Sequence, residues 1–120
     1  MADTVRTCNR DEEFYFKEGC FIVEISNSTQ DPDVSIALAR VEPGNSTRWH
    51  WLNGTFERYV IRKGKGLVEI GTEPATEVNE GDVVLIPPQT QQRISNTGDG
   101  DLEFFAICTP RFNLQNYHSL

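Results

Sequence analysis

A histidine and a glutamate on either side of an Asn-Gly pair are the residues best placed to do chemistry in this sequence. His50 precedes Asn53-Gly54 and Glu57 follows it. Asn-Gly is a strong signature of a two-residue β-hairpin turn, so we expect His50 to lie opposite Glu57 with Cβ atoms ~5 Å apart. A buried glutamate needs a cation, hydrogen bonds or a proton. Protonated His50, Arg48 or a divalent metal shared by His50 and Glu57 would meet that need.

Alternation along the two expected strands places further reactive groups beside this pair. Arg48, Leu52 and Tyr59 share the face of His50 and Glu57, because side chains two residues apart point the same way. A guanidinium binds carboxylate or phosphate oxygens, and a phenol donates a proton. Arg48 and Tyr59 are therefore candidate catalytic residues, or simply a rim cation over an aromatic ring.

The elements around these residues read as short strands. Apolar and β-branched runs recur about every 8 to 12 residues between turn residues, and no helical period is evident. The expected strands cover residues 14–17, 20–26, 34–41, 47–52, 55–62, 66–70, 83–87, 91–95 and 102–109. This pattern predicts an all-β sandwich or small barrel.

Two stretches of the sequence follow a known double motif. Gly44, His50, Glu57 and Gly64 fall on G-x5-H-x-H-x4-E-x6-G, in which Leu52 replaces the second histidine. The second stretch follows G-x5-P-x-G-x2-H-x3-N. Gly81, Pro87 and Asn96 match this motif, while Gln89 replaces its second glycine and Gln92 replaces its histidine. Together these stretches resemble the conserved motifs of the cupin superfamily.

The resemblance implies a single-domain jelly-roll β-barrel with a small-molecule site in its open mouth. Cupins commonly hold Mn, Fe, Ni, Cu or Zn there on three histidines and a glutamate. At those four positions this chain offers His50, Glu57 and the amide oxygen of Gln92, while Leu52 offers no ligand. An amide oxygen is an acceptable though weaker ligand for a divalent metal.

Two functions are compatible with this ligand set. In the first, a metal on His50, Glu57 and Gln92 chelates a small sugar-like or acid-like substrate for isomerase, lyase or dioxygenase chemistry, assisted by Tyr59 or Arg48. In the second, the barrel binds or senses a small molecule without metal and without catalysis. Whether the protein is an enzyme stays open at this point.

Charge and composition narrow the partners. Eighteen acidic and eleven basic residues give a net charge of -7, which disfavours nucleic acid and anionic membranes. No apolar run approaches the ~20 residues of a membrane-spanning helix. Three cysteines without close spacing and an N-terminus without an apolar segment favour a reducing, cytoplasmic location.

The 120 residues fit one domain, with residues 1–12 as an N-terminal arm and 113–120 as a less ordered tail. Trp49, Trp51 and Phe56 share the face opposite to His50, and two tryptophans are costly in water. We therefore expect a homodimer through the Trp49–Trp51 face.

Overall fold

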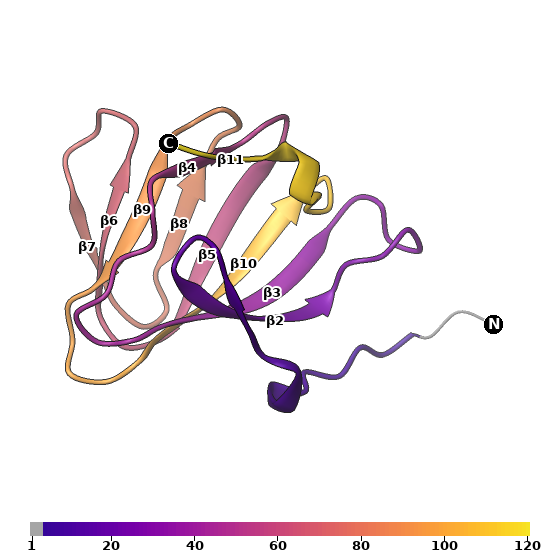
Figure 1. Cartoon of the computed structure of the whole chain (residues 1–120), viewed down its shortest axis with the longest axis horizontal. Helices are drawn as coiled ribbons and strands as arrows, with labels where there is room; N and C mark the ends of the chain where they lie inside the picture. Colours follow the sequence, from indigo (N-terminus) through magenta and orange to yellow (C-terminus); the bar gives the residue numbers. More distant parts are fainter. Residues whose placement is uncertain (1–3) are drawn as a thin grey trace.

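The computed structural model describes residues 4–120 as two antiparallel β-sheets that face each other (Figure 1). The six-stranded sheet has the order β1-β2-β3-β10-β5-β8, and the five-stranded sheet has the order β11-β4-β9-β6-β7. The strands are β1 (Phe14–Phe16), β2 (Cys20–Ser26), β3 (Ser35–Val41), β4 (His50–Leu52), β5 (Phe56–Lys63), β6 (Gly66–Ile70), β7 (Thr76–Val78), β8 (Val83–Ile86), β9 (Gln92–Asn96), β10 (Leu102–Thr109) and β11 (Tyr117–Ser119). Two short 3-10 helices, η1 (Arg10–Glu12) and η2 (Leu114–Asn116), complete the described chain.

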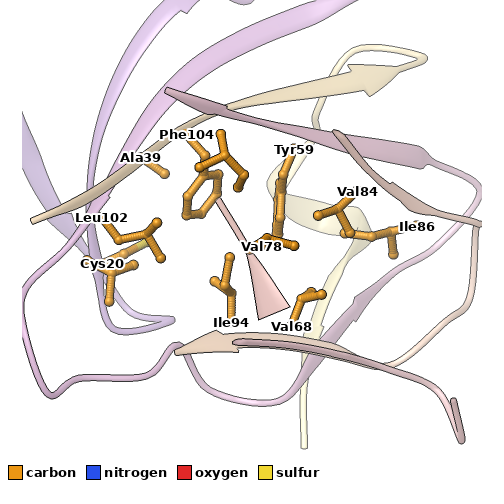
Figure 2. Close-up of a cluster of buried hydrophobic side chains, with 12 residues drawn as sticks. Cys20, Ala39, Tyr59, Val68, Val78, Val84, Ile86, Ile94, Leu102 and Phe104 are labelled. Carbon is orange, nitrogen blue, oxygen red and sulfur yellow. The ribbon is translucent and has the colours of Figure 1, made fainter. Parts of the chain in front are cut away.

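Alternating burial shows why these segments form strands. Along β5, Glu57, Tyr59 and Ile61 are buried while the residues between them are half-buried, as expected for one face against a core. The apolar core lies between the sheets, where Tyr59 and Phe104 of the larger sheet face Val68 and Ile94 of the smaller one (Figure 2). The all-β prediction is confirmed. Among residues 4–120, no helix has the length and apolar character needed to cross a membrane.

The hairpin predicted at Asn53-Gly54 is wrong in its pairing. The turn exists, and Gly54 has a φ of 64°, but β4 pairs with β9 and β11 while β5 pairs with β8 and β10. His50 is opposite Gln92 rather than Glu57. Both edges of each strand are already taken, so the chain crosses from one sheet to the other at this corner.

The loop before β9 holds this corner. The Gln89 side-chain oxygen accepts a hydrogen bond from the Gly54 backbone amide at 2.9 Å, and the Gln89 backbone amide donates to the Leu52 carbonyl at 2.9 Å. These bonds replace the cross-strand bonds of a hairpin. His50 and Glu57 consequently approach the same space from opposite sheets.

Segments near the two ends of the described chain contact the barrel. The tail expected over 113–120 forms η2 and β11, which pairs with β4 and buries Tyr117. Trp51 stacks on His118 of β11 with ring centroids 4.2 Å apart. In the N-terminal arm, Arg10 donates two hydrogen bonds to Glu103, at 2.9 and 2.8 Å. The sequence pattern also missed β7.

Candidate functional site

A cavity that is partly open to solvent lies between the two sheets, next to the core. Its polar groups include Glu18, His50 and Glu57, and much of its remaining wall is apolar or aromatic. The other lining residues are Phe14, Phe16, Ile22, Glu24, Asn27, Ser35, Ile36, Ala37, Leu52, Ala106, Cys108, Phe112 and Tyr117. Apolar walls with a few converging polar groups are typical of small-molecule sites.

His50 forms one side of the polar group. Its Nδ1 lies 2.7 Å from the Arg48 carbonyl oxygen, which only accepts, so Nδ1 carries a proton. Its Nε2 lies 2.9 Å from Glu18 Oε2, in the turn between β1 and β2. Burial lowers the pKa of His50, but the hydrogen bond and charge of Glu18 outweigh it and raise the pKa to about 9. At neutral pH the imidazolium and the Glu18 carboxylate form an ion pair.

Glu57 heads a chain of buried hydrogen bonds on the other side. Gln92 Nε2 donates to Glu57 Oε1 at 2.7 Å, and the Tyr59 hydroxyl donates to Gln92 Oε1 at 2.5 Å. An ionised carboxylate only accepts, so the amide group that faces Glu57 must be the NH2 and the amide oxygen must face Tyr59. Cys108 Sγ lies 3.6 Å from Glu57 Oε2 and donates to it.

The partners of Glu57 are all neutral donors. Burial raises the pKa of its carboxyl to about 7, and the negative charge of Glu18 acts in the same direction. Hydrogen bonds from Gln92 and Cys108 and the charge of His50 only partly oppose this. Glu57 is therefore a buried carboxyl group that gains or loses a proton near neutral pH.

The residues singled out in the sequence take different places around the cavity. His50, Leu52 and Glu57 line it. Gln92 and Tyr59 lie outside the lining: Gln92 donates to Glu57, and Tyr59 donates to Gln92. The Arg48 side chain is exposed, and only its backbone takes part, through His50 Nδ1 and an amide that donates to the Glu18 carbonyl at 2.6 Å.

Sequence reasoning missed Glu18, Cys108 as a partner of Glu57, and Tyr117. Glu18 lies in a tight turn before Gly19, whose φ is 99°, and no spacing relates it to His50. Tyr117 stacks on the His50 ring with centroids 5.2 Å apart. The pairing of β11 with β4, which brings these rings together, left no motif in the sequence.

The predicted ligand set does not fit a metal in this arrangement. The Gln92 oxygen already accepts from Tyr59, its NH2 faces Glu57, and His50 Nε2 is engaged by Glu18. Within residues 4–120, no group of three or more His, Cys, Asp or Glu side chains is placed to hold a metal ion. Divalent-metal sites in proteins need several such ligands converging on one point.

The sequence relationship agrees with the fold. The family model described as "Cupin domain" matches residues 37–108. The chain belongs to the cupin family. This cupin is 32% identical over 99 residues to an uncharacterized protein of Methanocaldococcus jannaschii, covering 81% of this chain and 78% of that protein. It is also 34% identical over 71 residues to an oxalate-binding protein of Thermotoga maritima, covering 59% of this chain and 58% of that relative's length.

Solved structures share the barrel. A variant of Streptomyces PAC13 with uridine superimposes with a TM-score of 0.81 at 20% identity, covering 99% of this chain and 92% of the other. A variant of Bacillus subtilis oxalate decarboxylase matches with a TM-score of 0.78 at 25% identity, covering 92% of this chain and 30% of that one. The predicted cupin jelly-roll fold is confirmed.

Proposed function

We propose that this cupin binds a small molecule in the cavity without a resident metal, and that Glu57 exchanges a proton with it. The observation that carries the proposal is the chain from Tyr59 through Gln92 to Glu57. Gln92 occupies the motif position of a metal-binding histidine, but its amide serves as a hydrogen-bond bridge between Tyr59 and Glu57. In that role its oxygen is directed at the Tyr59 hydroxyl, and its NH2 group is directed at Glu57.

Each side chain then has a distinct task. Glu57 lines the cavity, and its raised pKa of about 7 suits a group that accepts or returns a proton near neutral pH. The His50–Glu18 pair offers a charged hydrogen-bonding group across the same cavity. We assign Tyr59 and Gln92 the task of positioning Glu57, because neither lines the cavity. Proton exchange of this kind would serve isomerase or lyase chemistry, and binding alone would need only the cavity.

Metal-dependent chemistry is the second candidate. It is favoured by the neutral partners that Glu57 has in the described chain, Gln92 and Cys108, and by the Mn(II) centres named for the structurally similar oxalate decarboxylase. It requires Gln92 to release Tyr59 and His50 to release Glu18 before either residue ligates.

Thermal melts separate the two candidates. We expect added Mn, Ni or Zn to leave the melting temperature of the wild type unchanged, since ligands stabilise only the states that bind them. Replacing Leu52→His together with Gln92→His restores the imidazoles of the family motif and should yield a rise of several degrees with the same metals. A comparable rise in the wild type would favour the metal-dependent candidate.

Homodimer formation and a cytoplasmic location also stay proposals. The described cysteines are all free, and Cys20 and Cys108 are buried.

The Trp49–Trp51 face is only half-buried, although each ring has a partner within the chain: Trp51 stacks on His118, and Arg93 lies 4.9 Å from the centroid of the Trp49 ring.

Replacing Trp49→Ser and Trp51→Ser together tests the dimer. If this face is the interface, the double variant should sediment as a monomer or aggregate while the wild type sediments as a dimer. Circular dichroism would confirm that the variant is folded. A folded double variant with unchanged dimer mass would instead assign the tryptophans to packing within the chain. The exposed Val83 and Leu85 of β8 would then be the next candidate interface.

A further inference from the structure

The charges that line the cavity are predominantly negative. Three carboxylates line it, from Glu18, Glu24 and Glu57, against the single imidazole of His50. No lysine or arginine is among the lining residues in the described chain, 4–120. The net charge stays negative even when His50 carries two protons and Glu57 carries one. Such a cavity repels anions.

Glu57 differs from the other two carboxylates in being buried without a charged partner. Glu24 is exposed and Glu18 pairs with His50 at 2.9 Å, whereas within residues 4–120 the side chains that donate to Glu57 are the neutral Gln92 amide and Cys108 thiol. Glu57 is buried, with 8% of its surface exposed. A buried carboxylate without a cation is costly, so a positively charged group brought into the cavity would be stabilised there.

The aromatic wall supplies apolar surface for a ligand. Phe16 packs edge-on against both Phe112 and Tyr117, with ring centroids 6.4 and 5.2 Å apart. Tyr117 already has two partners, because the His50 ring stacks on it with centroids 5.2 Å apart and Lys17 Nζ lies 4.8 Å from its centroid. These rings therefore suit an apolar portion of a ligand, and the charged portion belongs at Glu57.

Tyr117 also has an unused polar group. Its hydroxyl is buried, and among residues 4–120 the structure gives it no hydrogen-bond partner, although Tyr117 lines the cavity. Buried polar groups are nearly always paired, so this hydroxyl needs a partner, which a bound water or a polar group of a ligand supplies. The hydroxyl oxygen accepts a hydrogen bond from an ammonium N–H, as a carboxylate oxygen does.

We propose that the ligand of this cavity is an organic cation, an ammonium group that donates to the Glu57 carboxylate and carries an apolar portion against Phe16, Phe112 and Tyr117. The inference rests on the proposed binding function and narrows its ligand class. It disfavours acids such as oxalate, for which the relative in Thermotoga maritima is named.

Three probes of one shape and different charge test the proposal. Benzylammonium, benzyl alcohol and benzoate share a phenyl ring and differ in the charged group. At about pH 8, where Glu57 is mostly ionised, titration calorimetry should give benzylammonium an affinity at least ~10-fold above that of benzyl alcohol, with benzoate weakest. Glu57→Gln should remove most of the advantage of the cation. Glu80→Gln is the matched control, because Glu80 is exposed and does not line the cavity.

The outcomes distinguish this inference from the proposed function. Equal or tighter binding of benzyl alcohol or benzoate, or an advantage of the cation that survives in Glu57→Gln, would overturn the cation proposal and leave the cavity as a binding site. Absence of benzylammonium binding would also overturn it. Stabilisation of the wild type by metals would count against the proposed metal-independent function and is measured separately.

Discussion

Glu57→Gln is expected to raise the free energy of unfolding at neutral and alkaline pH and to change its dependence on pH. The pKa of Glu57 is raised from 4.5 to about 7 by burial. Between these values the folded protein keeps a proton that the unfolded chain releases, so wild-type stability falls as the pH rises through this range. The loss is on the order of 3 kcal/mol, and the neutral amide of the variant escapes it.

Urea unfolding from about pH 4.5 to pH 8 measures this difference, and Glu18→Gln provides a comparison of opposite sign. The pKa of His50 is raised from 6.5 to about 9, chiefly by Glu18. That pair therefore stabilises the fold fully below 6.5, and the stabilisation is lost as the pH rises through 9. Glu18→Gln should be less stable than the wild type at neutral pH. Parallel pH profiles for the wild type and Glu57→Gln would show that burial does not penalise this carboxylate.

Gln92→Leu is expected to destabilise the protein by about 2 to 5 kcal/mol, because it leaves two buried groups without their partners. Leucine is similar in size, but it neither donates to Glu57 nor accepts from the Tyr59 hydroxyl. The cost comes from these unpaired polar groups rather than from a cavity.

The neighbouring residue supplies the control. Gln91 is exposed, so Gln91→Leu makes the same chemical change on the outside of the barrel. The urea midpoint of Gln92→Leu should fall well below that of Gln91→Leu. Similar midpoints for the two variants would mean that the bridge between Tyr59 and Glu57 contributes little to stability.

The strands themselves could be predicted because their information is local. Alternation and turn residues located β2, β6 and β10 with the bounds observed and six further strands within a few residues, but they missed β7 and β11. The pairing partners of β4 and β5 could not be predicted, because an Asn-Gly turn specifies a local bend and not which sheet the chain enters afterwards. Neighbours far away in the sequence, β8, β9, β10 and β11, decide that.

The candidate site was predictable to the same extent. Alternation and motif spacing identified His50 and Glu57. Both side chains line the cavity although they lie in different sheets, because the inner faces of the two sheets of a jelly roll face each other. Glu18 reaches His50 through a turn between the first two strands, a contact that depends on tertiary structure alone. The role of Gln92 likewise required the positions of Tyr59 and Glu57, since an amide is able to bind a metal or to bridge two side chains.

Metal content tests the central claim most directly. The protein would be purified without an affinity tag from cells grown with added Mn, Fe, Ni, Cu and Zn, and its metals would be measured by mass spectrometry beside those of Leu52→His with Gln92→His. We predict metal far below one ion per chain in the wild type and a clear gain in the double variant. One ion per wild-type chain, lost in Glu57→Gln, would contradict a cavity that works without a resident metal.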